Sequence, residues 1–418
     1  MSDNVTAIKG FADLFSPDSD AFTRMEGIAR EIFSRYGFTE LRTPILERTE
    51  LFCRGIGNET DVVQKEMYTF PDRKGRSLTM RPEATAGVMR AYIESGRSAD
   101  AVTKLFTIGP MFRYERPQKG RMRQFHQINC ECLGPSEPYA DAELVTMAMR
   151  FLEAIGLRNL TLQLNSLGCP SCRPAYRDTL RQWLSSLDES ALCEDCRRRM
   201  VTNPLRVLDC KVPTCKEHTA AAPKILDHNC PDCAAHFDTV RRLLDAEKVP
   251  YVINHRLVRG LDYYTRTTFE IVSDEIGAQG TVAGGGRYDG LVAQLGGPNV
   301  PGFGFACGME RLALLLPDSE EDREAARPDF YVVVLADAAR DSAYALTQAL
   351  RDAGFRGEMG FAVRSVKSAM RQAGKSGARF CLLIGEDELA ARTVMLKNMD
   401  SGEQASVAFA DVVARLQK

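Results

Sequence analysis

Residues 111–134, MFRYERPQKGRMRQFHQINCECLG, decide how this chain is interpreted, because they have the pattern of a charged β-hairpin. Side chains alternate along a strand, so Arg113 and Glu115 share one face at the end of the first strand. Pro117 and Gly120 interrupt the loop that follows. The cations of this loop are Arg116, Lys119, Arg121 and Arg123. The segment therefore predicts an antiparallel hairpin with positive charge concentrated at its tip.

The return strand adds polar side chains to the same face. Phe125, Gln127, Asn129 and Glu131 alternate with His126, Ile128, Cys130 and Cys132. Buried polar groups need partners, so a face that combines Gln127, Asn129 and Glu131 suits a polar ligand. A solvated outer face of a hairpin explains this segment equally well when it is taken alone. As a ligand site, the hairpin would hold a polyphosphate beside a small polar molecule.

The hairpin resembles motif 2 of the class II aminoacyl-tRNA synthetases, in the form found in histidyl-tRNA synthetases. In that family the arginine at the position of Arg113 binds the α-phosphate of ATP, and the ring at the position of Phe125 stacks on adenine. Tyr114 stands where the family usually has histidine, and Met122 where it usually has tyrosine. Both lie beside the binding positions, so we interpret them as tolerated variation.

Residues 77–90, SLTMRPEATAGVMR, have the pattern of a strand that runs into a helix. Glu83 and Thr85 stand at the expected start of that helix, where such side chains often cap backbone N–H groups. Capping alone explains them equally well. In the family both positions bind the α-amino group of histidine, a role that suits a carboxylate because an ammonium ion needs charged acceptors.

Residues 255–271, HRLVRGLDYYTRTTFEI, match the first histidine-specific motif of these synthetases and include Arg259. The phenols of Tyr263 and Tyr264 can enclose a planar ring and offer an O–H group. A neutral imidazole has one donor and one acceptor nitrogen. We expect Glu131 at one nitrogen and Tyr264 at the other, which would reject analogues lacking these groups by factors of about 10⁴.

Two glycine-containing segments continue the resemblance. Residues 283–291, AGGGRYDGL, match the second histidine-specific motif and contain Tyr288, although three glycines alone usually mark a tight loop. Residues 302–316, GFGFACGMERLALLL, match motif 3, in which the arginine at the position of Arg311 holds the γ-phosphate. A guanidinium at a helix start is an effective anion site, but a charged first turn of a surface helix has the same pattern.

The resemblance implies a two-step reaction in which histidine and ATP give histidyl-adenylate and pyrophosphate, and histidine then passes to tRNA(His) with release of AMP. Arg259 and Arg113 are the expected catalytic residues, since they would stabilise charge at the α-phosphate while Mg²⁺ bridges phosphate oxygens. The implied histidine site comprises Glu83, Thr85, Gln127, Glu131, Tyr263, Tyr264 and Tyr288. The implied ATP site comprises Arg113, Glu115, Arg121, Arg123, Phe125 and Arg311.

The domain organisation follows from shifts in composition. For residues 1–325 the resemblance implies an α+β catalytic domain on an antiparallel sheet, and the cysteine-rich, charged composition of residues 166–251 indicates a mostly helical insertion within it. Residues 317–328, PDSEEDREAARP, lack an apolar period and predict a linker. Strands and helices alternate over residues 329–418, which predicts a three-layer α/β domain.

Residues 365–389 of this last domain resemble the anticodon-binding domain of the family. Basic residues recur there every three or four positions, at Arg364, Lys367, Arg371 and Lys375. Together with Arg116 and Lys119 of the hairpin, they are the expected contacts to tRNA phosphates. Taken alone, the stripe also fits a solvated charged helix face.

The N-terminal region resembles motif 1, which forms the homodimer interface in the family. Apolar residues at helical spacing predict a helix over residues 21–36, and residues 38–46 predict a strand that contains Pro44. The pattern alone fits an ordinary amphipathic helix packed on its own sheet equally well. The resemblance therefore implies a homodimer.

The overall composition is ordinary for a globular chain: of 418 residues, 44% are hydrophobic and 26% are charged. No run of about 18 uncharged apolar residues occurs, so we expect no membrane span. No secretory signal is recognised either, which makes the cytoplasm the expected location. The formal net charge of −2 means that a nucleic-acid partner would have to be met by local basic patches.

Eight of the thirteen cysteines are Cys169, Cys172, Cys193, Cys196, Cys210, Cys215, Cys230 and Cys233. Paired cysteines in a cytosolic chain favour zinc thiolates over disulfides. The set suits two tetrahedral sites or one site with spare thiols, and His218, His228 and His236 are further candidate ligands. Ordinary free thiols remain the alternative. Many members of the family lack these cysteines, so such a zinc ion would be structural.

The main alternative is a catalytically silent paralogue that binds histidine as a regulatory subunit of ATP phosphoribosyltransferase. Such paralogues generally lack the anticodon-binding domain and have lost phosphate-binding arginines, whereas Arg113, Arg259 and Arg311 are present here. A zinc-binding interaction module is a third interpretation. It explains residues 169–233 and nothing else in the chain.

Overall fold

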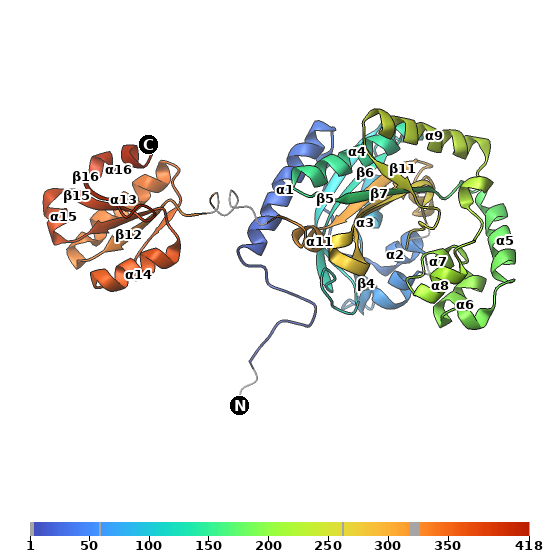
Figure 1. Cartoon of the computed structure of the whole chain (residues 1–418), viewed down its shortest axis with the longest axis horizontal. Helices are drawn as coiled ribbons and strands as arrows, with labels where there is room; N and C mark the ends of the chain where they lie inside the picture. Colours follow the sequence, from blue (N-terminus) through green and yellow to red (C-terminus); the bar gives the residue numbers. More distant parts are fainter. Residues whose placement is uncertain (1–3, 58–59, 261–262, 318–323, 325–326, 418) are drawn as a thin grey trace. The chain divides into compact units, whose positions relative to one another are not determined.

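The computed structural model divides the chain into two compact units, Met1–Pro317 and Asp318–Lys418 (Figure 1). It describes all residues except 1–3, 58–59, 261–262, 318–323, 325–326 and 418. Most of the predicted linker over residues 317–328 therefore lies outside the described residues, as do the end of the predicted catalytic domain at residue 325 and two residues of the first histidine-specific motif. Among the described helices, none combines the length and apolar composition that crossing a bilayer requires.

The first unit is built on an eight-stranded sheet with the order β1-β5-β6-β11-β10-β9-β7-β8. In this order the strands are Thr39–Glu40, Thr103–Phe112, Gln124–Leu133, Gly302–Gly308, Thr281–Arg287, Thr265–Ser273, Leu160–Ser166 and Tyr251–Ile253. Only the two edge pairs, β1 with β5 and β7 with β8, are parallel. The predicted antiparallel hairpin is confirmed as β5 and β6, with Arg113 directly after the end of β5.

One face of this sheet is covered by α1 (Asp18–Arg35), α4 (Pro138–Ala154) and α9 (Pro231–Ala246), as Figure 1 shows. Ile128, Cys130 and Cys132 of β6 belong to the core between the sheet and these helices. Because side chains alternate along a strand, Gln127, Asn129 and Glu131 face the opposite way. The alternation predicted for the return strand is therefore confirmed.

A second, three-stranded sheet lies beside the large one, with the order β2-β4-β3. Its strands are Leu46–Arg48, Ser77–Met80 and Tyr68–Pro71, and α2 (Thr49–Ile56) follows β2. The strand predicted over residues 38–46 is wrong in its middle, since only its ends are extended, as β1 and β2 in different sheets. Pro44 has no N–H to donate to a ladder, which explains the break between the two strands.

The insertion is mostly helical, as predicted. Its helices are α5 (Arg173–Leu184), α6 (Glu194–Thr202), α7 (Leu205–Leu208) and α8 (Pro213–His218), followed by α9. Tyr176, Leu180 and Leu184 of α5 share a hydrophobic core with Val88 and Met89 of α3 (Thr85–Glu94). The short helices α10 (Leu291–Gln294) and α11 (Met309–Ala313) complete the unit. The insertion thus contributes to the same buried core as the helix that follows Glu83.

The second unit has a five-stranded sheet with the order β13-β12-β14-β15-β16. These strands are Gly357–Met359, Phe330–Val334, Phe380–Ile384, Thr393–Asn398 and Gln404–Ala408. Helices α13 (Arg340–Asp352) and α16 (Val412–Leu416) pack on one face, α14 (Val366–Ser376) packs on the other, and α15 (Glu386–Ala391) joins β14 to β15. The predicted three-layer α/β arrangement is confirmed. Strands β13 and β16 carry little sequence signal, because β13 has only three residues and β16 is mostly exposed.

Candidate active site

A cavity of about 430 Å³ opens on the polar face of the large sheet. Its lining residues come from β6, β9, β10, β11 and α11, from the hairpin loop, from the segment before β9, and from the insertion at Asp209 and Lys211. Of the residues predicted to bind substrates, it is lined by Arg113, Glu115, Arg121, Phe125, Gln127, Arg259 and Arg311. These positions are up to 198 residues apart in sequence (113 to 311), so the folding of the sheet brings them together.

Arg259 forms an ion pair with Glu270 of β9 inside this cavity. Burial alone would lower the pKa of Arg259, but the carboxylate of Glu270 outweighs it and holds that pKa above its usual value. The hydroxyl of Thr281 donates to the other oxygen of Glu270 at 3.0 Å. Among the described residues, the buried Nε of Arg259 has no hydrogen-bond partner. Arg259 is therefore a fixed cation with an N–H group to spare for a ligand. The sequence analysis missed Glu270.

Arg311, which was predicted to bind the γ-phosphate, lines the cavity from the first turn of α11. Its Nη1 donates to the carbonyl of Thr281 at 2.6 Å, and its Nε donates to the carbonyl of Gly120 at 3.2 Å. Burial and the nearby Arg121 lower the pKa of Arg311. The adjacent Glu310 accepts from the backbone N–H of His126 at 2.9 Å. Glu310, which was not predicted as a site residue, thus ties α11 to β6.

Arg113 lies between the hairpin and the segment that precedes α3. Its Nε donates to the carbonyl of Pro82 at 2.8 Å, and its guanidinium carbon lies 5.4 Å from the centre of the Phe125 ring. Glu115 pairs with Arg121 across the loop. The cationic group and the aromatic ring predicted for the α-phosphate and adenine are therefore neighbours in one cavity.

The remaining cations of the hairpin loop do not line the described cavity. Arg123 stacks over the ring of Tyr114, with its guanidinium carbon 3.9 Å from the ring centre, and its Nε donates to the carbonyl of Glu115 at 3.2 Å. Arg116 and Lys119 are exposed. Arg123 thus holds the shape of the loop, and the other two face solvent.

A cluster of buried polar side chains surrounds Glu131, and it adjoins the cavity through Tyr264, whose ring centre lies 5.6 Å from the guanidinium carbon of Arg259. The hydroxyl of Thr85 donates to Oε1 of Glu131 at 2.6 Å, and the phenol of Tyr288 donates to Oε2. The rings of Tyr263 and Tyr264 lie 4.7 Å apart, and the Tyr288 ring centre lies 5.7 Å from that of Tyr263. The three tyrosines predicted to bind histidine therefore pack against one another, and Tyr288 connects them to Glu131.

Glu83 belongs to the same cluster. Its Oε1 accepts from the backbone N–H of Ala86 at 2.7 Å, so it caps α3, and its Oε2 accepts from the phenol of Tyr263 at 3.5 Å. The capping alternative for Glu83 is thus correct as a local contact, and it leaves Oε2 weakly bonded. Burial raises the pKa of Glu83.

Burial is the dominant influence on the pKa of Glu131. It raises the pKa of Glu131 to about 8, against the opposing effect of the hydrogen bonds from Thr85 and Tyr288. A Cβ at Gly304 of β11 would overlap Oε2 of Glu131, so only glycine leaves room for this carboxylate. Within the described part of the chain, Oε1 of Gln127 and Nδ2 of Asn129 are buried without hydrogen-bond partners. Polar atoms on this face are available to a ligand.

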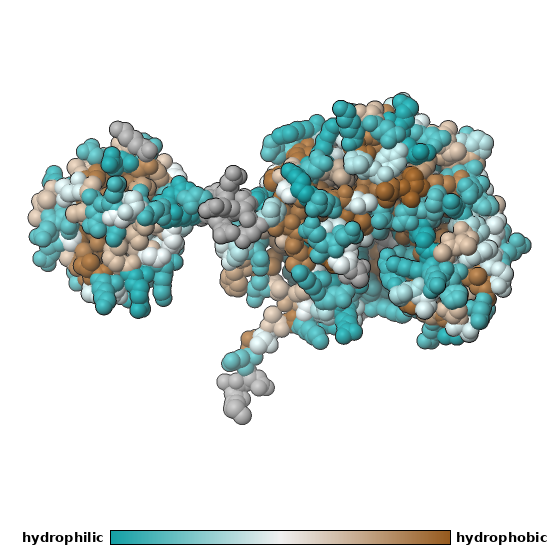
Figure 2. Space-filling model, viewed as in Figure 1, coloured by the Kyte–Doolittle hydropathy of each residue, from teal (hydrophilic) through white to brown (hydrophobic). Residues whose placement is uncertain are grey.

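The C-terminal unit carries the basic stripe on and before α14. Arg364, Arg371 and Lys375 line a shallow groove with Tyr331 and Glu358. Lys367 is exposed outside this groove. Figure 2 shows hydrophilic side chains over α14. The stripe is thus an accessible surface and not part of a core.

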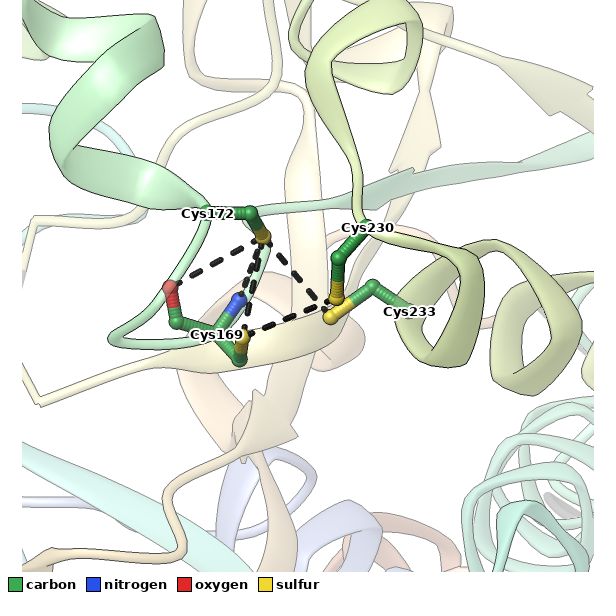
Figure 3. A group of neighbouring side chains, drawn as sticks. All are labelled: Cys169, Cys172, Cys230 and Cys233. Atoms are coloured by element: carbon green, nitrogen blue, oxygen red, sulfur yellow. Dashed lines mark hydrogen bonds between the residues drawn. The ribbon is translucent and has the colours of Figure 1, made fainter.

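The eight cysteines of the insertion gather in two groups of four. The first quartet is Cys169, Cys172, Cys230 and Cys233 (Figure 3), and the second quartet is Cys193, Cys196, Cys210 and Cys215. Within each group all sulfur atoms lie within 4.8 Å of one another. His218, His228 and His236 belong to neither group among the described residues. Of the two arrangements that the spacing left open, this grouping of the thiols matches the one that would provide two metal sites.

The chain is similar to known proteins along its whole length. A family model described as Histidyl-tRNA synthetase matches residues 10–312, and one described as Anticodon binding domain matches residues 329–418. A relative from Nitratidesulfovibrio vulgaris (strain DP4), named Histidine--tRNA ligase, is 70% identical over 99% of this chain and 98% of its own. A relative of the same name from Oleidesulfovibrio alaskensis is 67% identical over 97% of each chain. The crystal structure of apo S. aureus histidyl-tRNA synthetase is 34% identical, has a TM-score of 0.80 and covers 99% of this chain and 100% of its own. This chain therefore belongs to the histidyl-tRNA synthetase family.

Proposed function

We propose that this chain ligates histidine to tRNA(His), first forming histidyl-adenylate from histidine and ATP and then transferring histidine to the tRNA. The observation that carries the proposal is the joint presence of Arg113, Arg259 and Arg311 in one cavity, with Arg259 next to Tyr264 of the buried cluster around Glu131. Phosphates and a polar amino acid would meet there. The names of the relatives point to the same reaction. We propose a cytoplasmic location, because that is where this reaction would find its tRNA.

The mechanism we infer is electrostatic. The histidine carboxylate attacks the α-phosphate, and pyrophosphate leaves with the electron pair of the broken P–O bond. Arg113 and Arg259 would stabilise the charge that develops on the phosphate oxygens, because fixed cations in a partly closed cavity need little reorganisation. Arg311 would bind the γ-phosphate, Arg121 and Glu115 would border the triphosphate, and Phe125 would stack on adenine.

The histidine would lie against the cluster around Glu131. Glu83, with its weakly bonded Oε2, and Thr85 would bind the α-amino group. Glu131 and a tyrosine phenol, from Tyr264 or Tyr288, would bind the two imidazole nitrogens. Gln127 offers an unpartnered buried oxygen within the described residues. A ligand that lacks either ring nitrogen would leave one of these buried groups unsatisfied.

Mg²⁺ would enter as a complex with ATP. The carboxylates that line the cavity are already engaged, Glu115 with Arg121, Asp209 with Lys211, Glu270 with Arg259 and Glu310 with His126. Mg²⁺ often retains several waters and binds chiefly to substrate phosphates. We therefore infer that phosphate oxygens and water supply most of its ligands.

We further propose that two copies of the chain associate. Ile45, Leu46 and Phe70 lie in or next to the three-stranded sheet, and 42–44% of each side chain is exposed. Ile45 and Leu46 belong to the segment that resembles motif 1, and exposed apolar side chains there are consistent with a covered face. Light scattering on the purified chain would report a mass twice that of the monomer, and a monomeric mass would remove this part of the proposal.

The first test is ATP–pyrophosphate exchange with each of the twenty amino acids. Exchange with histidine alone would support the proposed adenylation. Binding of histidine without exchange would instead favour the regulatory paralogue, although the three cavity arginines and the C-terminal domain count against it. Charging of tRNA(His) transcripts then tests the second step.

A further inference from the structure

The two cysteine quartets have the spacing of metal-bound thiolates. Sγ of Cys169 lies 3.7 Å from that of Cys172 and 3.9 Å from that of Cys230, and Sγ of Cys172 lies 3.9 Å from that of Cys233 (Figure 3). In the second quartet, Sγ of Cys193 lies 3.9 Å from that of Cys210. The close sulfur–sulfur separations in the two groups are therefore nearly equal.

These separations identify the kind of group that fits. Zinc thiolates have Zn–S bonds of about 2.3 Å, so the sulfurs of a regular tetrahedron lie about 3.8 Å apart. In a disulfide the two sulfur atoms are bonded and lie only about 2.05 Å apart. The cysteines of an iron–sulfur cluster bind different iron atoms, which spreads them farther apart than one shared ion does. The spacing fits a single tetrahedral ion in each quartet.

The backbone also favours thiolates at these positions. Cys172, Cys193 and Cys230 are the residues before the first turns of α5, α6 and α9. Free N–H groups at a helix start stabilise negative sulfur. The N–H of Cys193 donates to Sγ of Cys215 at 3.2 Å, and the N–H of Cys169 donates to Sγ of Cys172 at the same distance. Each quartet thus has donors that compensate part of its charge.

We propose that each quartet binds one zinc ion, and that the two ions hold the insertion in place as a wall of the active site. Binding converts four thiols to thiolates, so the protons they carry are released to solvent and no redox change occurs. The metal sites themselves do not depend on the proposed ligase reaction.

The first quartet supports the histidine side of the site. It joins the loop before α5 to the start of α9, which closes the base of the insertion. In that loop, Gly168 accepts from the N–H of Arg266 at 2.9 Å. Arg173, one residue after Cys172, donates from Nη2 to the carbonyl of Tyr264 at 2.5 Å. An ion at the first quartet would therefore fix the backbone that carries Tyr264.

The second quartet supports the ATP side. Cys210 stands between Asp209 and Lys211, and both of these residues line the cavity. Arg206, in the helix just before them, donates from Nη1 to the carbonyl of Arg259 at 2.9 Å. An ion at the second quartet would therefore fix the segment that positions Arg259.

The test is the metal content of the full chain, purified without chelators and measured by inductively coupled plasma mass spectrometry. We expect two zinc ions per chain in the wild type, and one in each of the variants Cys233→Ser and Cys210→Ser. Cys53→Ser is the matched control, because Cys53 lies in α2 outside both quartets, and it should retain two. Less than one zinc ion per wild-type chain, a stoichiometric iron content or disulfides within the quartets would overturn the proposal.

Cobalt provides a second readout that does not require the variants to fold. Wild-type chain loaded with Co²⁺ should bind two cobalt ions per chain. Its spectrum should show thiolate-to-cobalt charge-transfer bands and the intense visible bands of tetrahedral cobalt. Weak bands typical of octahedral cobalt would contradict a four-sulfur site. The Cys210→Ser variant, which should lose the zinc ion of the second quartet, should also show weaker ATP–pyrophosphate exchange. If this variant lacks that zinc ion and its exchange is unchanged, the proposed link between the second quartet and Arg259 is wrong.

Discussion

Arg259 and Glu270 form an ion pair that faces the reaction cavity from two segments of the first unit. Both partners are anchored independently. The carbonyl of Arg259 accepts from Arg206, and Glu270 accepts from Thr281. The guanidinium is therefore oriented before any phosphate arrives, which is the condition under which a fixed charge is most effective in a transition state.

Replacing Arg259 by alanine should slow ATP–pyrophosphate exchange about 10²–10³-fold, the usual effect of losing one such donor. Histidine binding, measured by calorimetry, should change much less because the cluster around Glu131 is left intact. Arg241→Ala is the control, since Arg241 lies on the outer side of α9 with Asp238. Near-normal exchange in Arg259→Ala would disprove its catalytic role.

Replacing Glu270 by glutamine should reduce exchange less than the loss of Arg259, since it removes only the partner that orients the guanidinium. The discriminating measurement is the double variant Arg259→Ala with Glu270→Gln. If Glu270 acts through Arg259, the double variant should be no slower than Arg259→Ala alone. Additive losses would show that Glu270 has a separate contact with the substrates.

Gly304→Ala should abolish measurable histidine binding, because the added Cβ overlaps Oε2 of Glu131 and also approaches the carbonyl of Cys130 at 2.7 Å. Gly290→Ala is a matched control, since a Cβ there meets no atom of the described chain within 4 Å. Calorimetric titration with histidine and thermal unfolding of both variants would check this. Normal histidine binding by Gly304→Ala would mean that the Glu131 side chain can move away from residue 304 without weakening histidine binding.

The sequence was sufficient where a regular period applies. Two-residue alternation placed Gln127 and Glu131 on one face of β6, and the structure has them there. It was insufficient where partners are distant or irregular: Glu310 bonds to His126, which is 184 residues away, and no local pattern reports such a contact. Arg123 sits in a loop without a period, so its direction toward Tyr114 was not predictable.

The cysteines illustrate the same limit. Their spacing identified pairs but left the combination of pairs open. The structure combines the two outer pairs, Cys169 with Cys172 and Cys230 with Cys233, and nests the other quartet between them. That nesting follows from the tertiary arrangement, which brings the loop before α5 next to the start of α9. It is a tertiary property with no local sequence signal.

Glu131 should make the stability of the first unit depend on pH. Its folded pKa of about 8 is above the value of about 4.3 for an unfolded glutamate. The folded state therefore keeps a proton that the unfolded state loses, so this contribution is full below pH ~4 and disappears as pH rises towards ~8. Glu131→Gln cannot ionise, and its unfolding midpoint should fall less than that of the wild type between pH 5 and 8. Parallel curves for the two proteins would show that Glu131 is already ionised in the folded chain.

The basic stripe gives a prediction that separates the two reaction steps. Arg371→Ala with Lys375→Ala should weaken tRNA(His) binding and raise the KM for tRNA, while ATP–pyrophosphate exchange stays unchanged because neither residue lines the cavity. Each lost phosphate contact should lower the slope of log affinity against log salt by about 1, so the double variant should lose about 2. Arg415→Ala, exposed on α16, should leave the slope unchanged. An unaltered slope in the double variant would mean that α14 is a solvated helix face and that tRNA is bound elsewhere.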